Sequence, residues 1–287
     1  MNDLFIDLHV HTNFSDGNFT PQEAVKHAQK IGLGAIAITD HDITDGITPA
    51  IIEGARRGIE VIPGIELSVD LKDSSVGEMH ILGYYIDWQN PAFQEKLKIF
   101  RKTRKERAET ILAKLSQLNI NLNRDKIFDK SNEDKAIGRL HIANRMIEEG
   151  YVKNTKEAFL QYLAFNRPAY VSKHHMEPQE AIELIKKVKG IPVLAHPNYG
   201  NLTDKQFIKD LISYGLCGIE AWHSKHSPSV QQKFMDLAVE FNLLITGGSD
   251  CHGPTLTNLP IMGKQNIPYD ALVYLKKTKF KIDNGSV

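Results

Sequence analysis

The sequence predicts an α/β protein in which strands alternate with helices in one barrel-like domain. Short apolar runs and helical patterns alternate over the first 90 residues and again after about residue 177. Repeated β-α units favour parallel strands with helices outside them, in a barrel or an open sheet. Residues of about 91–175 break this alternation and carry few strand signals. We therefore expect residues 1–90 and 176–287 to form the barrel and residues 91–175 to form a helical insertion that contributes to substrate binding.

Strands and helices can be placed in order along the first part of the chain. The stretch Thr20-Pro21-Gln22-Glu23 has the pattern of a capping box with proline at the first helical position, and Gly32 ends that helix. A second helix is expected over residues 49–57. Short apolar runs predict strands over residues 4–10, 35–39, 61–67 and 80–86.

The last part of the chain repeats the alternation. Thr203 is expected to cap one helix, and Ser227-Pro228 opens another. Helices are predicted over residues 178–189, 203–214 and 227–241, and strands over residues 192–195, 218–222 and 243–246. In the insertion we expect a long helix over about 94–118 and shorter ones over 140–149 and 155–162.

The overall composition excludes several classes of protein. Lys and Arg together number 35 and equal Asp and Glu, so net charge gives no sign of a nucleic-acid partner. No run of 18 apolar residues and no secretory signal is visible, which argues against a membrane span. The cysteines, Cys217 and Cys251, do not form a CxxC pair, and a reduced cytoplasmic setting is expected.

Histidines and acids gather at the ends of the apolar runs. His9 and His11 lie two apart on a predicted strand, so their side chains share one face, with Asp7 on the same face. Two such imidazoles can bind one divalent metal, although a hydrogen-bonded histidine pair would give the same pattern. The other strands end or begin in further candidate ligands: Asp16, His41, Glu66, His80, His196, Asp250 and His252.

These candidates together predict a multi-metal centre. The carboxyl ends of parallel strands converge on the functional face of an α/β fold, although His80 stands at the start of its predicted strand. Histidine with carboxylate ligands suits Mn, Fe or Zn, and a glutamate can bridge two ions. We expect two or three divalent ions that generate a metal-bound hydroxide for attack on phosphorus. The sequence contains neither a P-loop nor a GxSxG motif, so nothing points to nucleoside-triphosphate chemistry or to a serine nucleophile.

The ordered clusters resemble the PHP (polymerase and histidinol phosphatase) family. The resemblance covers nearly the whole chain through DLHVHTNFSDG, ITDHD, GIELS, HILGYYI, VLAHP and GGSDCHG. It implies a distorted (β/α)7 barrel with a helical insertion. It also implies that one ion is held by His9, His11, Glu66 and Asp250, and a second by Asp16, His41 and His252. Glu66 would bridge to a third ion, completed by His80 and His196.

The insertion narrows the expected substrate. Segments around Gly138-Arg139-Leu140 and Asn166-Arg167-Pro168 resemble the nucleoside 3′,5′-bisphosphate phosphatases, a group whose relatives also trim RNA from its 5′ end. The expected substrate is therefore a small phosphorylated nucleotide or a short oligonucleotide. No protein partner is predictable. The alternatives are a histidinol-phosphate phosphatase and, from another class, a non-catalytic metal-binding regulatory module.

Five further candidates for substrate contact or catalysis lie outside the metal clusters. Arg139 and Arg167 could bind phosphate, because a guanidinium matches phosphoryl oxygens, or could be surface or salt-bridging arginines. His223 and His226 could each contact phosphate or protonate the leaving group, with His223 the candidate for catalysis, or they could simply be polar residues at the end of a strand. Trp222 could stack on a base or simply be buried. A basic stretch over residues 96–107 is interpreted as a solvated face or as an electrostatic funnel for an oligonucleotide.

Overall fold

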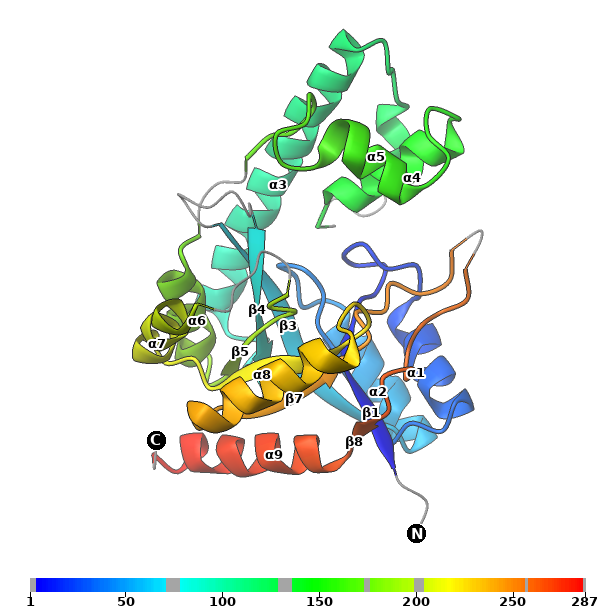
Figure 1. The fold of residues 1–287 in the computed structure, drawn as a ribbon. Helices are drawn as coiled ribbons and strands as arrows, with labels where there is room; N and C mark the ends of the chain where they lie inside the picture. Colours follow the sequence, from blue (N-terminus) through cyan, green and yellow to red (C-terminus); the bar gives the residue numbers. More distant parts are fainter. Residues whose placement is uncertain are drawn as a thin grey trace.

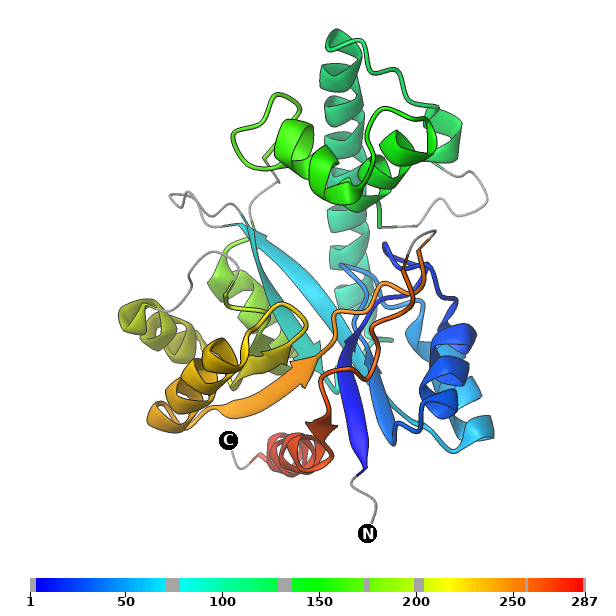
Figure 2. The ribbon, with the colours of Figure 1, turned by 45° about the vertical axis from the view of Figure 1, so that its right-hand side comes forward.

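The computed structural model describes residues 4–70, 78–128, 136–172, 176–198, 204–255 and 258–285. Its strands form one mixed sheet in the order β7-β6-β5-β4-β3-β2-β1-β8, which curls into a nearly closed barrel (Figures 1 and 2). This confirms the predicted α/β barrel. The strands are β1 (Phe5–Val10), β2 (Ala35–Ile38), β3 (Glu60–Asp70), β4 (Glu78–Tyr84), β5 (Ile191–Leu194), β6 (Gly218–His223), β7 (Leu244–Gly248) and β8 (Ile267–Pro268).

The direction of two strands departs from the all-parallel expectation. Strand β4 runs antiparallel to both β3 and β5, and β8 runs antiparallel to β1. The reason is local, because the connection from Asp70 to Glu78 is too short for the crossover of about a dozen residues that a parallel pair needs. The reversal also explains the position of His80, which pairs with Ser68 near the end of β3. The start of β4 therefore lies at the same barrel end as the ends of the parallel strands.

Helices cover the barrel and close it. Helix α9 lies across one end of the barrel in both views (Figures 1 and 2). Its Leu272 and Leu275 share a buried cluster with Ile6 and Leu8 of β1. The barrel helices are α1 (Pro21–Lys30), α2 (Ile47–Arg57), α6 (Pro178–Lys187), α7 (Lys205–Tyr214), α8 (Pro228–Glu240) and α9 (Asp270–Asp283).

Most predicted helix starts are found. Thr20 accepts from the backbone N–H of Glu23 at 3.2 Å, and the carboxylate of Glu23 accepts from the N–H of Thr20 at 2.8 Å, so the capping box is confirmed. Ser227 caps α8 as predicted. Helix α7 instead begins after Asp204, whose side chain accepts from the N–H of Gln206 at 2.8 Å. The predicted cap Thr203 lies outside the described residues.

The segment after β4 is helical and rises above one end of the barrel (Figure 1). Its long helix α3 joins two cores: Phe93 and Leu97 pack into the barrel core, whereas Ile111 and Leu115 belong to a separate cluster with other residues of the segment. The predicted helix over residues 155–162 divides into a short α-helix and a π-helix. The elements are α3 (Pro91–Gln117), η1 (Arg124–Lys126), α4 (Arg139–Glu148), α5 (Thr155–Ala158) and η2 (Phe159–Leu163).

Two irregularities in strand register lie beside the candidate site. The pairing of β1 with β2 shifts between Asp7 and Val10, and the pairing of β6 with β7 shifts between Glu220 and Trp222. Bulges of this kind redirect side chains near active sites. Among the described residues, we find no helix with the length and apolar character needed to cross a membrane.

Candidate metal centre

The predicted ligands converge at one end of the barrel. Strand β1 carries His9, and His11 follows directly after its end; β3 carries Glu66, and β4 carries His80. The others stand in the turns after β1, β2, β5 and β7: Asp16, His41, His196, Asp250 and His252. Asp7 does not join them. Its carboxylate accepts from the backbone N–H groups of Ser249 at 2.9 Å, Gly263 at 2.8 Å and His9 at 3.3 Å, so it is used to hold the backbone.

His9, His11, Glu66 and Asp250 form one four-residue group whose ligand atoms all lie within 4.8 Å of one another. The Nε2 atoms of His9 and His11 are 3.1 Å apart. Glu66 Oε2 lies 3.3 Å from His9 Nε2 and 3.2 Å from His11 Nε2, and Asp250 Oδ1 lies 3.2 Å from the latter. This is the set that the family resemblance implies for one ion.

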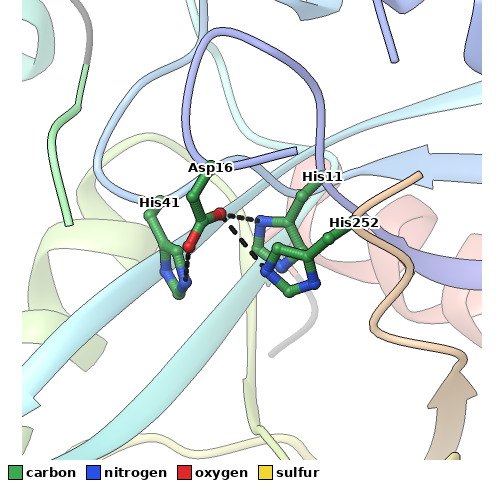
Figure 3. A group of neighbouring side chains, drawn as sticks. All are labelled: His11, Asp16, His41 and His252. Atoms are coloured by element: carbon green, nitrogen blue, oxygen red, sulfur yellow. Dashed lines mark ion pairs between the residues drawn. The ribbon is translucent and has the colours of Figure 1, made fainter. Parts of the chain in front are cut away.

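Asp16 lies at the centre of a second group, with His11, His41 and His252 (Figure 3). Its Oδ1 is 3.3 Å from His252 Nε2, and its Oδ2 is 3.8 Å from His41 Nε2. His11 turns its Nδ1 toward the same carboxylate at 3.7 Å. The expected members of the second set are thus together, with His11 lying between the two groups.

Glu66 connects the first group to a third. Its Oε1 lies 2.7 Å from His80 Nδ1 and 2.9 Å from His196 Nε2, and these two nitrogens are 3.2 Å apart. His41 Nδ1 is 3.1 Å from the other oxygen of Glu66. The carboxylate of Glu66 is therefore shared between two groups of histidines, in the position expected of a bridging ligand.

The donor set fits divalent cations. Glu66 Oε2 has three imidazole nitrogens within 3.3 Å but makes no hydrogen bond with them, and neither does the buried Oδ1 of Asp16. Buried charged oxygens are costly without partners, and a cation would satisfy both. Facing nitrogens such as the Nε2 atoms of His9 and His11 can likewise be satisfied by one cation, since neutral imidazoles bind metals through a lone pair.

The charged groups of the cluster shift one another's pKa values. Burial alone would lower the pKa of His11, but its contacts with Asp250, Glu66 and Asp16 raise that pKa to about 10. His9 is affected in the same direction, because the charges of Glu220, Glu66 and Asp250 outweigh burial and raise its pKa well above the usual value. Burial opposes ionisation of the carboxylates, yet the neighbouring histidines hold the pKa values of Asp16, Glu66 and Asp250 well below their usual range.

Two buried carboxylates support the ligands without joining the groups. Asp40 accepts from the N–H of Thr12 at 2.7 Å, from its Oγ1 at 2.6 Å and from Ser15 Oγ at 2.5 Å, which fixes the turn after β1. Glu220 contacts His9 Nδ1 at 2.9 Å. Sequence reasoning missed the role of Glu220. A charged residue inside the apolar run 218–222 was the available signal.

An arginine-lined pocket adjoins the ligands. Asp16, His41 and His80 line one side. The other side is contributed by residues of the helical segment: Arg104, Arg107, Gly138, Arg139, Leu140 and Phe159. The Arg139 guanidinium carbon lies 5.4 Å from the Phe159 ring centre and 5.8 Å from that of Tyr170, and its Nη1 donates to the carbonyl of Leu163 at 3.1 Å. Arg167 is exposed and does not line this pocket.

The basic stretch of α3, residues 96–107, is not uniformly exposed to solvent. The interpretation of this stretch as a solvated face is therefore corrected. Arg101, Arg104 and Arg107 are buried. Arg104 Nε donates to Asp42 Oδ2 at 2.6 Å, and Arg107 Nε donates to the carbonyl of Val171 at 2.7 Å. One face of α3 therefore packs its arginines inward. The sequence could not show this, because the partners lie far away along the chain.

The residues predicted around β6 are placed differently from one another. His223 is fully buried, and its Nε2 lies 3.5 Å from Asp250 Oδ2. His226 is buried with its Nδ1 2.8 Å from the carbonyl of Ala221 and its ring 5.1 Å from that of His223. Trp222 is half-buried and packs against the barrel cluster that contains Leu8 and Ala195. Of these three residues, it is His223 that lies within ion-pair distance of a predicted metal ligand, Asp250.

A barrel that gathers histidines and carboxylates at one end defines a class of metal-dependent hydrolases. Residues 7–275 match the PHP domain, and the chain belongs to this family. A 3′,5′-nucleoside bisphosphate phosphatase of Chromobacterium violaceum is 34% identical over 252 residues, which cover 87% of each chain. The 5′-3′ exoribonuclease Rnm of Escherichia coli is 33% identical over 257 residues, or 88% of this chain and 86% of that protein.

The solved structures agree with the family. A protein of Bifidobacterium adolescentis assigned as a metal-dependent phosphoesterase superimposes with a TM-score of 0.86 at 29% identity, covering 95% of both chains. The predicted class is confirmed: the chain is a metal-dependent phosphoesterase and so a phosphoric ester hydrolase. The similar phosphatases and exonucleases do not favour the histidinol-phosphate alternative, and they argue against a non-catalytic module.

Proposed function

We propose that this enzyme removes phosphate from nucleoside 3′,5′-bisphosphates and from the 5′ ends of short RNA. The observation that carries the proposal is the pocket in which Asp16 and His41 face Arg104, Arg107 and Arg139. A substrate with one phosphate at the metal ligands and a second group against the arginines would fill both sides. The bisphosphatase and exoribonuclease relatives at about one-third identity support this choice.

Two or three ions of Mn, Fe or Zn would be held by the predicted ligands, with Glu66 shared between two of them. When bound, such ions supply Lewis acidity that activates water and withdraws charge from phosphoryl oxygens. The protein supplies the positioning. Phe159 and Tyr170 flank the guanidinium of Arg139 and keep it directed, so it can hold a phosphate oxygen with a charge-assisted hydrogen bond.

His223 is our candidate for the group that gives a proton to the leaving oxygen. Its Nδ1 accepts the backbone N–H of Lys225 at 3.2 Å, so the proton of the neutral ring is on Nε2, toward Asp250. In that tautomer Nε2 carries a proton, so it can donate this proton but cannot bind an ion. Arg167, His226 and Trp222 remain candidates for contact with longer substrates, and the helical segment 91–175 is proposed to act as the substrate-binding part of the molecule.

A three-substrate assay tests the function. The purified protein with Mn²⁺ is expected to turn over adenosine 3′,5′-bisphosphate and a short 5′-phosphorylated RNA, and to act poorly on histidinol phosphate. His9→Ala and Asp250→Ala should lose bound metal and activity together, as measured by elemental analysis and phosphate release. Full turnover by either variant in metal-replete buffer would refute the site assignment.

A further inference from the structure

Glu220 uses both of its carboxylate oxygens inside the barrel. The side chain is fully buried in β6. Its Oε1 lies 2.9 Å from Nδ1 of His9, and its Oε2 accepts the backbone N–H of His196 at 2.8 Å. The carboxylate thus joins β1 to the turn after β5, which are the two segments that supply ligands to the first and third groups. Glu220 itself belongs to none of the ligand groups.

The first contact fixes the tautomer of His9. A carboxylate accepts, so Nδ1 of His9 donates to it, and in the neutral ring that would bind an ion the lone pair stands on Nε2. Nε2 faces the other members of the first group, at 3.3 Å from Glu66 and 3.5 Å from Asp250. Carboxylate partners of this kind orient histidine ligands and raise their basicity.

The second contact fixes a strained backbone. His196 has φ of 27°, in the region that non-glycine residues rarely adopt, so its conformation must be imposed by its surroundings. The hydrogen bond from its N–H to Glu220 is one such constraint. With the backbone held in this way, the His196 ring reaches Glu66 Oε1 at 2.9 Å.

We propose that Glu220 is a positioning residue that sets the first and third ion sites together, through the ring of His9 and the backbone of His196. The inference rests on the proposed ion binding at these ligands. Glutamine cannot replace glutamate in this role, because its side chain offers one acceptor oxygen where the site requires two. Either orientation of the amide would place its NH₂ group against the N–H of His196 or against Nδ1 of His9. The latter contact forces the His9 proton onto Nε2, where an ion would bind.

Ion binding in Glu220→Gln tests the proposal. Metal-free protein is titrated with Mn²⁺ by calorimetry, and bound Mn is counted by elemental analysis. The wild type should bind two or three ions, whereas the variant should lose about 10–100-fold in affinity for at least one of them, the usual cost of removing such a partner. The rise in unfolding temperature on adding Mn²⁺ should shrink accordingly, since that rise depends on ion affinity.

The control separates positioning from mere packing. Glu53→Gln removes another buried carboxylate, one that pairs with Arg56 and Arg57 on α2, and should leave Mn²⁺ affinity unchanged. A purely structural role for Glu220 would lower the unfolding temperatures of metal-free and Mn-loaded protein equally, and that result would overturn the proposal.

A second variant covers the case in which Glu220→Gln does not fold. Glu220→Asp keeps both acceptors but is too short to reach both partners, so it should also bind Mn²⁺ more weakly than the wild type. Unchanged affinity in this variant would equally count against the role. If the wild type binds no Mn²⁺, the proposed function itself fails, independently of Glu220.

Discussion

Arg104 and Asp42 form a buried ion pair that ties the helical segment to the metal centre. The two residues are 62 positions apart in the chain, and Nε of Arg104 donates to Oδ2 of Asp42 at 2.6 Å. Nη2 of the same arginine donates to Ser68 Oγ at 2.7 Å. Asp42 directly follows His41, and Arg104 lines the adjoining pocket. One arginine therefore connects the wall of this pocket with the turn that carries His41, a candidate metal ligand.

Removal of this arginine should reduce both stability and activity. Arg104→Ala leaves the carboxylate of Asp42 buried beside Ser68 without the guanidinium, and breaking a buried pair in this way costs about 3 kcal/mol. Urea denaturation should show the loss in the free energy of unfolding. Lys205→Ala, which removes an exposed pair with Glu240, is the control and should cost about 0.5 kcal/mol or less. Equal effects of the two variants would contradict the importance of the buried pair.

Arg139 is predicted to bind a substrate phosphate. Arg139→Ala should lower kcat/KM for adenosine 3′,5′-bisphosphate by about 10–100-fold, the value of one charge-assisted hydrogen bond, with little change in unfolding temperature. Arg167→Ala is the matched comparison, since Arg167 is exposed outside the pocket and should matter less for this small substrate. A larger loss in Arg167→Ala would instead assign phosphate binding to that residue.

Gly248 is required for the placement of His9. A Cβ at this position would come within 2.5 Å of the backbone nitrogen of His9 and closer still to its Cβ. Gly248→Ala should therefore displace the ligand, weaken Mn²⁺ binding and cost about 2 kcal/mol of stability from overpacking. Gly34→Ala serves as the control, because the atoms nearest to an added Cβ there belong to the half-exposed side chain of Leu4, which can move. Calorimetric titration of both variants with Mn²⁺ measures the difference.

The stability of the metal-free protein should depend on His11. Its pKa is raised to about 10 in the folded state from an ordinary value of 6.5. A raised pKa gives a stabilising contribution that is fully present below the unfolded value and is lost as the pH rises through the folded value. Metal-free protein should therefore lose stability between about pH 7 and pH 10, as followed by thermal unfolding. The same curve for His11→Gln should be flatter, and a curve of unchanged slope would exclude His11 as the cause.

The sequence predicted most of the residues that gather at the barrel end. Polar residues that follow short apolar runs, such as His41 after β2 and Asp250 after β7, lie together because parallel strands end at one edge. His80 did not fit that rule, since the direction of β4 depends on the connection between two strands and not on the residues of β4 alone. The resemblance of the sequence to the PHP family nevertheless placed His80 among the expected ligands.

Other features depend on contacts that local patterns do not contain. The register shifts in β1 and β6 lie beside His9 and Glu220, and they arise from pairing with other strands. The buried arginines of α3 look like a solvated face until Asp42 and Val171 are brought beside them. The tautomer of His9 is likewise set by Glu220, a residue 211 positions away.

Ions bound at the predicted ligands would have a second role, as cross-links across the seam of the barrel. Strand β1 meets the turn after β7 through the bridge between Val10 and Cys251. Ligands stand on both sides of this seam, with His9 and His11 on one and Asp250 on the other. An ion held across it would join segments from opposite ends of the sequence in the folded barrel, and its binding free energy would add to the stability of the folded state. Chelation should therefore loosen the barrel at the seam first, and amide hydrogens of β1 and β7 should exchange sooner than those of β2 and β3.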